Sequence, residues 1–153
     1  MTETSHDIRT LNSLIATTID SVDGYRTSAE AVENTRFADL FTARAGERSS
    51  VAEQLRNEVR KLGGNPEDDG TVLASAHRGF LNLKAAVVDL DDKAIVNEVE
   101  RGEDHIKAKY EEALQDNDLS PSTRSLIEAS FASVKSGHDE MSQLKHSLEA
   151  QGN

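Results

Sequence analysis

Apolar residues recur at intervals of three and four along most of the chain, a spacing typical of amphipathic α-helices. The pattern predicts long helices over about 6–33, 36–62, 92–115 and 121–149, and a shorter helix over about 72–90. The chain has only two prolines, and both fall at predicted helix boundaries. The sequence is therefore predicted to be all-α.

The residues between these segments are of the types that start and end helices. Thr35 and Asp91 are predicted N-caps, and Ser120 is the predicted N-cap of a helix that begins at Pro121. The segment 63–70 opens with two glycines and contains a proline, so it is predicted to be a loop.

The lengths of the predicted helices and links indicate one architecture. At a rise of about 1.5 Å per residue, the long helices are about 35 to 40 Å long. Short links join the first helix to the second and the last two helices to each other, so both pairs are expected to be antiparallel. We predict a single domain over 1–153, a four-helix bundle with a crossover connection that carries the additional short helix.

Each long helix has a polar residue in its predicted apolar face: Thr18, Arg48, Glu103 and His138. A buried charge without a partner is very costly, so we expect these side chains to pair with one another or with polar neighbours.

One interpretation of these polar residues is a structural network of ion pairs and hydrogen bonds that fixes the register of the helices. Its expected members are Arg44, Arg48, Glu100, Glu103, His138 and Thr18.

The other interpretation is a metal site, with Glu47, Glu103 and His138 as ligands of iron or manganese. Carboxylates and imidazoles from different helices form dinuclear centres in bundles, which normally include two Glu-x-x-His pairs. Here the only such pair is Glu3 with His6, at an end of the chain that we expect to fray. The sequence therefore lacks the full ligand set of a dinuclear centre.

Glycines lie inside all four long predicted helices, at Gly24, Gly46, Gly102 and Gly137. A glycine within a helix is about 1 kcal/mol less favourable than alanine. We therefore expect close approach of another group to the backbone at these positions.

The composition narrows the function. The net charge of -11 disfavours binding to nucleic acid or to anionic membrane surfaces. No apolar run approaches the roughly 18 residues needed to span a bilayer, and no secretory signal is evident, so we expect a cytoplasmic protein. The chain has no cysteine, so any metal must be held by carboxylates and imidazoles.

Several motifs resemble a known family. They are DGY at 23–25, LGG at 62–64, HRG at 77–79 and RGED at 101–104, with SGHDEM in the last helix. The chain resembles a bacterial family of ferritin-like four-helix-bundle proteins related to the YciE and YciF stress-associated proteins. The resemblance implies a ferritin-like fold and a metal site at mid-bundle, nearest to Glu47, Glu103 and His138.

Two functions follow as expectations. The first is a non-enzymatic, stress-associated or interaction protein that forms a homo-oligomer, namely a dimer. The alternative is an iron- or manganese-binding protein with activity toward oxygen or peroxide at a degenerate mid-bundle site.

Overall fold

The structure, a computed structural model, describes residues 2–69 and 91–151. Its helices are α1 (Thr2–Ala31), α2 (Thr35–Lys61), α4 (Asp92–Leu114) and α5 (Pro121–Gln151). Turns and loops make up the rest of these residues, which confirms the predicted all-α four-helix bundle. The helix predicted over 72–90 lies outside the described residues. Within them, no helix carries an apolar stretch sufficient to cross a bilayer.

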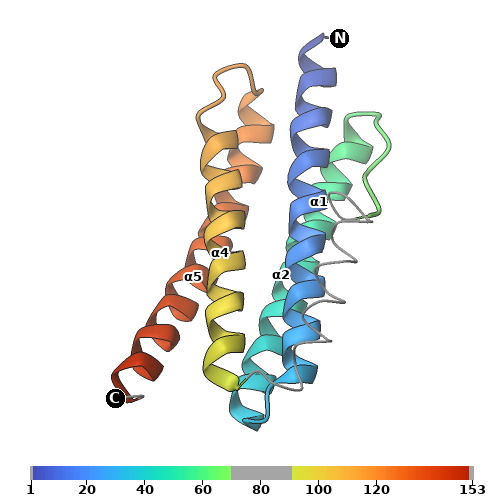
Figure 1. The fold of residues 1–153 in the computed structure, drawn as a ribbon. Helices are drawn as coiled ribbons and strands as arrows, with labels where there is room; N and C mark the ends of the chain where they lie inside the picture. Colours follow the sequence, from blue (N-terminus) through green and yellow to red (C-terminus); the bar gives the residue numbers. More distant parts are fainter. Residues whose placement is uncertain (1, 70–90, 152–153) are drawn as a thin grey trace.

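The helices form two antiparallel hairpins, α1 with α2 and α4 with α5 (Figure 1). The hairpins pack on each other through α1 against α4 and α2 against α5. Figure 1 shows that α2 ends where α1 begins, whereas α4 begins at the opposite end of the bundle. The end of α2 and the start of α4 therefore lie at opposite ends of the bundle, as the predicted crossover requires.

The start of α2 corrects one predicted cap. Asn34, not Thr35, is the N-cap: its Oδ1 accepts from the backbone N–H of Arg36 at 2.9 Å and of Phe37 at 3.4 Å. Thr35 is the first residue of the helix. Both residue types cap helices well, so the sequence did not distinguish the two adjacent positions.

The start of α4 ties the two hairpins together. Asp91 caps α4 as predicted, since its Oδ1 accepts from the Ala94 N–H at 2.9 Å. The carboxylate of Asp92 accepts from the backbone N–H groups of Glu33 and Asn34 at 2.8 and 2.9 Å. The first residue of α4 thus holds the link between α1 and α2.

At the other end, α2 stops at a glycine turn. Gly63 has φ of +86°, and its N–H donates to the Arg60 carbonyl, while the Gly64 N–H donates to the Val59 carbonyl. This is a Schellman motif, and it confirms the predicted C-cap glycine. A Cβ at Gly64 would lie 2.8 Å from Ile8 Cδ1, so α1 packs directly on the turn.

A buried carboxylate of α1 holds the start of α5. Asp7 accepts from the Ser120 N–H at 3.2 Å, from the Ser120 hydroxyl at 2.6 Å and from the Thr123 hydroxyl at 3.0 Å. The Ser120 side chain, predicted to cap α5, therefore donates to Asp7. Pro121 is the first residue of α5, as predicted.

Two apolar clusters fill the interior, separated by a polar layer that contains Thr18, Arg48 and Glu103. The cluster on the N-terminal side of α1 comprises Leu11, Leu14, Ile15, Val51, Leu55, Val59, Ile106, Tyr110, Leu119, Ile127 and Val134. The cluster near the link between α1 and α2 comprises Val22, Tyr25, Val32, Phe37, Phe41, Ala45, Ile95, Val96, Val99 and Met141.

Candidate functional site

The middle of the bundle holds a buried ion pair between Arg48 of α2 and Glu103 of α4. Arg48 Nη1 donates to Glu103 Oε1 at 2.7 Å and Nη2 donates to Oε2 at 2.5 Å, and the side chains are 0% and 2% exposed. Arg48 also donates to Ser21 Oγ at 2.7 Å and to the Val134 carbonyl oxygen at 3.3 Å. This ion pair therefore connects all four described helices.

The surroundings keep Arg48 charged. Burial disfavours its charge, but the hydrogen bonds and negative charge of Glu103 outweigh burial, so the pKa of Arg48 is raised. Its Cζ lies 5.6 Å from the centroid of the Tyr25 ring, within cation–π range. Thr18 Oγ1 lies 2.8 Å from the Tyr110 hydroxyl. Thr18 is thus buried in the polar layer, where it shares a hydrogen bond with Tyr110 and not with the ion pair.

Glu47 lies on the side of the bundle where α2 meets α5. Its carboxylate oxygens each lie 2.9 Å from Arg44 Nη1, and the Ser133 hydroxyl also donates to it. Arg44 Nε donates to Glu140 of α5 at 2.8 Å. Glu47 is 40% exposed, so this group is a partly solvated link between the two helices.

The interior does not fit an iron or manganese centre built on Glu47, Glu103 and His138. Both oxygens of Glu103 accept hydrogen bonds from Arg48, whose positive charge would repel a metal cation. Glu47 is bound in the same way by Arg44. The three expected ligands thus belong to three separate groups of side chains.

His138 does not point into the interior, contrary to the sequence prediction. It lies at the edge of the interface between α4 and α5 with 15% of its side chain exposed, and Gly137 takes the buried position. His138 Nε2 lies 2.6 Å from Asp104 Oδ1, and Nδ1 lies 3.2 Å from Asp139 Oδ1. The imidazole is therefore held between carboxylates of both helices.

Glu100, Asp104 and His138 form a group that we call the α4–α5 cluster. Glu100 and Asp104 lie one helical turn apart on α4, and His138 faces them from α5. One ligand atom from each residue lies within 4.8 Å of the other two. Glu100 is 12% exposed and lies 3.5 Å from Lys145 Nζ. An imidazole and two carboxylates at this spacing could hold a metal ion.

Sequence reasoning identified Glu100 and His138 but missed Asp104. The signal was present: two carboxylates at positions i and i+4 lie on the same side of a helix. The sequence did not show that His138 of α5 faces these two carboxylates, because that depends on how the two helices pack.

The fold and these polar groups define the protein as an all-α four-helix bundle with a polar centre. The chain belongs to the family of the domain of unknown function DUF2383, whose family model matches residues 6–116. The match includes most of α1 and all of α2 and α4. Among curated proteins, none matches the chain.

Proposed function

We propose that this protein is a non-enzymatic helical-bundle protein that binds one divalent metal ion, manganese or iron, in the α4–α5 cluster. The observation that carries this proposal is the convergence of an imidazole and two carboxylates from two helices within 4.8 Å. The proposal keeps the metal expected from the sequence but moves it to the edge of the bundle.

The chemistry of the α4–α5 cluster supports a cation of this type. Imidazole is a good ligand for iron, and carboxylates are good ligands for manganese. Glu100 and Asp104 are two negative charges one helical turn apart, and a divalent ion would add to the positive charge that Lys145 already supplies to Glu100. The contact of Asp139 with His138 Nδ1 resembles the carboxylate contacts that orient imidazole ligands in metal sites.

The buried ion pair supports the non-enzymatic part of the proposal. The interior of the bundle, where a ferritin-like reactive centre would lie, is filled by Arg48 and Glu103. Their hydrogen bonds occupy the carboxylate that oxygen or peroxide chemistry at mid-bundle would need as a ligand. Among the residues that the structure describes, the α4–α5 cluster offers three ligand residues for one ion.

A stress-associated role, relationship to YciE and YciF, cytoplasmic location and self-association as a dimer belong to the same proposal. The motif resemblance supports the first two, and the cysteine-free composition supports the third. Sedimentation equilibrium tests the dimer, and a monomer at all concentrations would exclude it.

The metal proposal is tested by titrating the full-length, tag-free protein with Mn²⁺ and measuring the free ion by electron paramagnetic resonance. We compare the wild type with His138→Ala and with His105→Ala, an exposed histidine next to Asp104 on α4. Loss of a ligand should weaken binding in the α4–α5 cluster by about tenfold or more. His105→Ala should bind as the wild type does.

Glu100→Gln supplies an independent variant, because it removes a ligand charge but keeps the shape of the side chain. It should also weaken Mn²⁺ binding without loss of helical circular dichroism. Identical binding curves for the wild type, His138→Ala and Glu100→Gln would show that the α4–α5 cluster holds no metal.

A further inference from the structure

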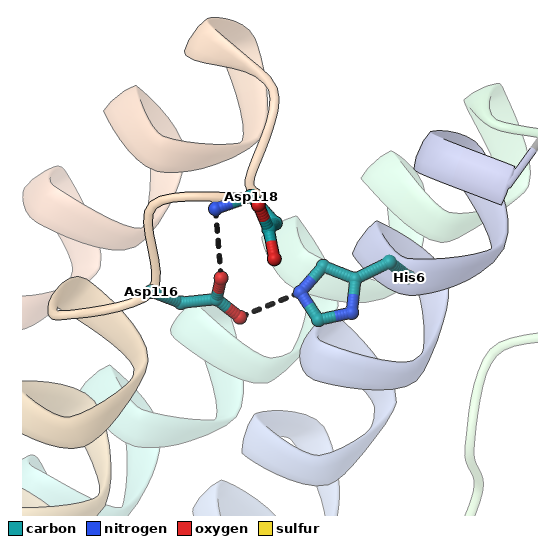
Figure 2. A group of neighbouring side chains, drawn as sticks. All are labelled: His6, Asp116 and Asp118. Carbon is teal, nitrogen blue, oxygen red and sulfur yellow. Dashed lines mark hydrogen bonds and ion pairs between the residues drawn. The ribbon is translucent and has the colours of Figure 1, made fainter.

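A second group of ligand atoms lies at the end of the bundle where α1 begins, and we call it the end cluster. It consists of His6 on α1 with Asp116 and Asp118 in the turn that links α4 to α5 (Figure 2). His6 Nε2 lies 2.6 Å from Asp116 Oδ2. One ligand atom from each of the three residues lies within 4.8 Å of the other two.

The turn that carries the two aspartates is held in a fixed shape. The Asp118 N–H donates to Asp116 Oδ1 at 2.8 Å, which orients the carboxylate so that Oδ2 points to His6. Arg124 donates to the Leu114 carbonyl oxygen at 2.7 Å and also to the Asp116 carbonyl oxygen. The hydrogen bonds of the turn therefore hold Asp116 in place beside His6 before any ion binds.

The ion pair between His6 and Asp116 does not use all the ligand atoms present. Among the described residues, no hydrogen bond to the Asp118 carboxylate is found, although it lies next to the pair. Two carboxylates close together repel each other, and a divalent cation between them and the imidazole would remove this repulsion. The third ligand is what distinguishes this group from a surface ion pair.

A groove of about 320 Å³ opens beside His6 and Asp116, between α1 and α4. Its walls include the cations Arg9 and Lys109, the carboxylate of Glu112 and the hydroxyls of Thr10 and Ser13. An ion with three protein ligands keeps a coordination position for water or for another small ligand. The groove gives such a ligand space and polar side chains to contact.

We propose that the end cluster is a second divalent-metal site, of the type that binds Zn²⁺ through one imidazole and two carboxylates, with an open position toward the groove. This site is separate from the α4–α5 cluster and does not depend on the function proposed for it. A bound ion would join the first turns of α1 to the turn between α4 and α5.

The test uses tag-free, full-length protein and Zn²⁺ as the probe, with binding measured by equilibrium dialysis. Four proteins are compared: the wild type, His6→Ala, His138→Ala and the double variant. With one ion for each of the two groups, we expect two ions per wild-type chain, one in each single variant and none in the double variant. His146→Ala, an exposed histidine on α5, is the matched control.

Hydrogen exchange provides a second measurement at the end cluster itself. In the His138→Ala background, Zn²⁺ should slow exchange of the amides in the first turns of α1, and Asp118→Asn should abolish this effect. Asp118→Asn removes only a ligand charge at an exposed position, so the fold should be retained.

The outcomes separate the two proposals. If His138→Ala binds no Zn²⁺ or shows no protection of α1, the end cluster is not a metal site. If His6→Ala binds no Zn²⁺ while His138→Ala still binds one ion, the end cluster is confirmed and the proposal for the α4–α5 cluster is wrong.

Discussion

The buried pair of Arg48 and Glu103 is the residue-scale feature that organises the interior. Removing two charges from water is costly, and their attraction repays this cost only with good geometry and additional hydrogen bonds. Arg48 makes two bonds to Glu103 and further bonds to Ser21 and to the Val134 carbonyl, and among the described residues only its Nε finds no partner. We therefore assign the pair a role in fixing the mutual register of the helices.

Glu103→Ala should destabilise the protein by about 3 to 5 kcal/mol, because it leaves the guanidinium of Arg48 buried without its counter-charge. Glu111 is exposed on the same helix, and Glu111→Ala should cost well under about 1 kcal/mol. Urea unfolding followed by circular dichroism measures both values. Equal small losses would contradict the central role of the ion pair.

Gly137→Ala should also disturb the ion pair. A Cβ at this position would lie 2.5 Å from Arg48 Nη2 and 3.1 Å from Glu103 Oε2. Arg48 is held on several sides and cannot withdraw easily, so we expect a loss of about 1 to 3 kcal/mol. A Cβ at Gly102 meets nothing within 4 Å, so Gly102→Ala should stabilise the protein by about 0.5 to 1 kcal/mol.

Urea unfolding measures the stability of Gly137→Ala and Gly102→Ala. A change of stability of the same sign in both variants would contradict this prediction. The close approach expected at the helix glycines is found at Gly137 but not at Gly46 or Gly102, where no neighbour lies within 4 Å of the added Cβ.

At the scale of the element, hydrophobic periodicity predicted the helices and most of their buried faces. It placed Arg48 and Glu103 in the interior, because α2 and α4 each have an unbroken apolar face that fixes the position of a polar member. On α5, positions 137 and 138 both fit the spacing between Val134 and Met141. The structure buries Gly137, because only a residue without a side chain leaves room for Arg48.

Contacts between distant segments could not be predicted in this way. Asp116 lies 110 residues from His6, and no local pattern connects the two. The start of the chain was expected to fray, yet α1 extends to Thr2, and Asp7 is bonded to Ser120. These contacts depend on how the two hairpins align, which the period of a single helix does not specify.

Asp7→Ala tests the joint between α1 and α5. The variant leaves the Ser120 N–H and the Thr123 hydroxyl without their acceptor in a buried position, which should cost about 1 to 3 kcal/mol. Asp39→Ala, at an exposed position on α2, is the control and should change stability by less than about 0.5 kcal/mol. Thermal unfolding gives both values, and amide exchange should accelerate at the start of α5 in Asp7→Ala alone. Unchanged exchange there would contradict the proposed joint.

For the whole molecule, the two tyrosines report on the two halves of the interior. Tyr25 belongs to the apolar cluster near the link between α1 and α2, and Tyr110 belongs to the other cluster. The chain has no tryptophan and no third tyrosine, so the near-ultraviolet spectrum comes mainly from these two side chains. Their ionisation therefore measures whether the whole bundle is folded.

Alkaline pH should destabilise the bundle through these tyrosines. Burial raises the pKa of Tyr110 to about 12, and burial together with the charge of Glu103 raises the pKa of Tyr25 further. An unfolded tyrosine has a pKa of about 10, so between pH of about 10 and 12 the unfolded chain loses protons that the native protein keeps. The free energy of unfolding should therefore fall as pH rises, by roughly 3 kcal/mol for Tyr110 over this range.

Urea unfolding at a series of alkaline pH values measures this decrease, and Tyr110→Phe should reduce its slope even though the variant also loses the hydrogen bond to Thr18. In the native wild type, tyrosinate absorbance should not develop until the protein unfolds, and both tyrosines should then ionise together. Gradual ionisation of one tyrosine near pH 10 in protein that keeps its helical circular dichroism would show that its hydroxyl is open to water. The two apolar clusters would then not form one sealed interior.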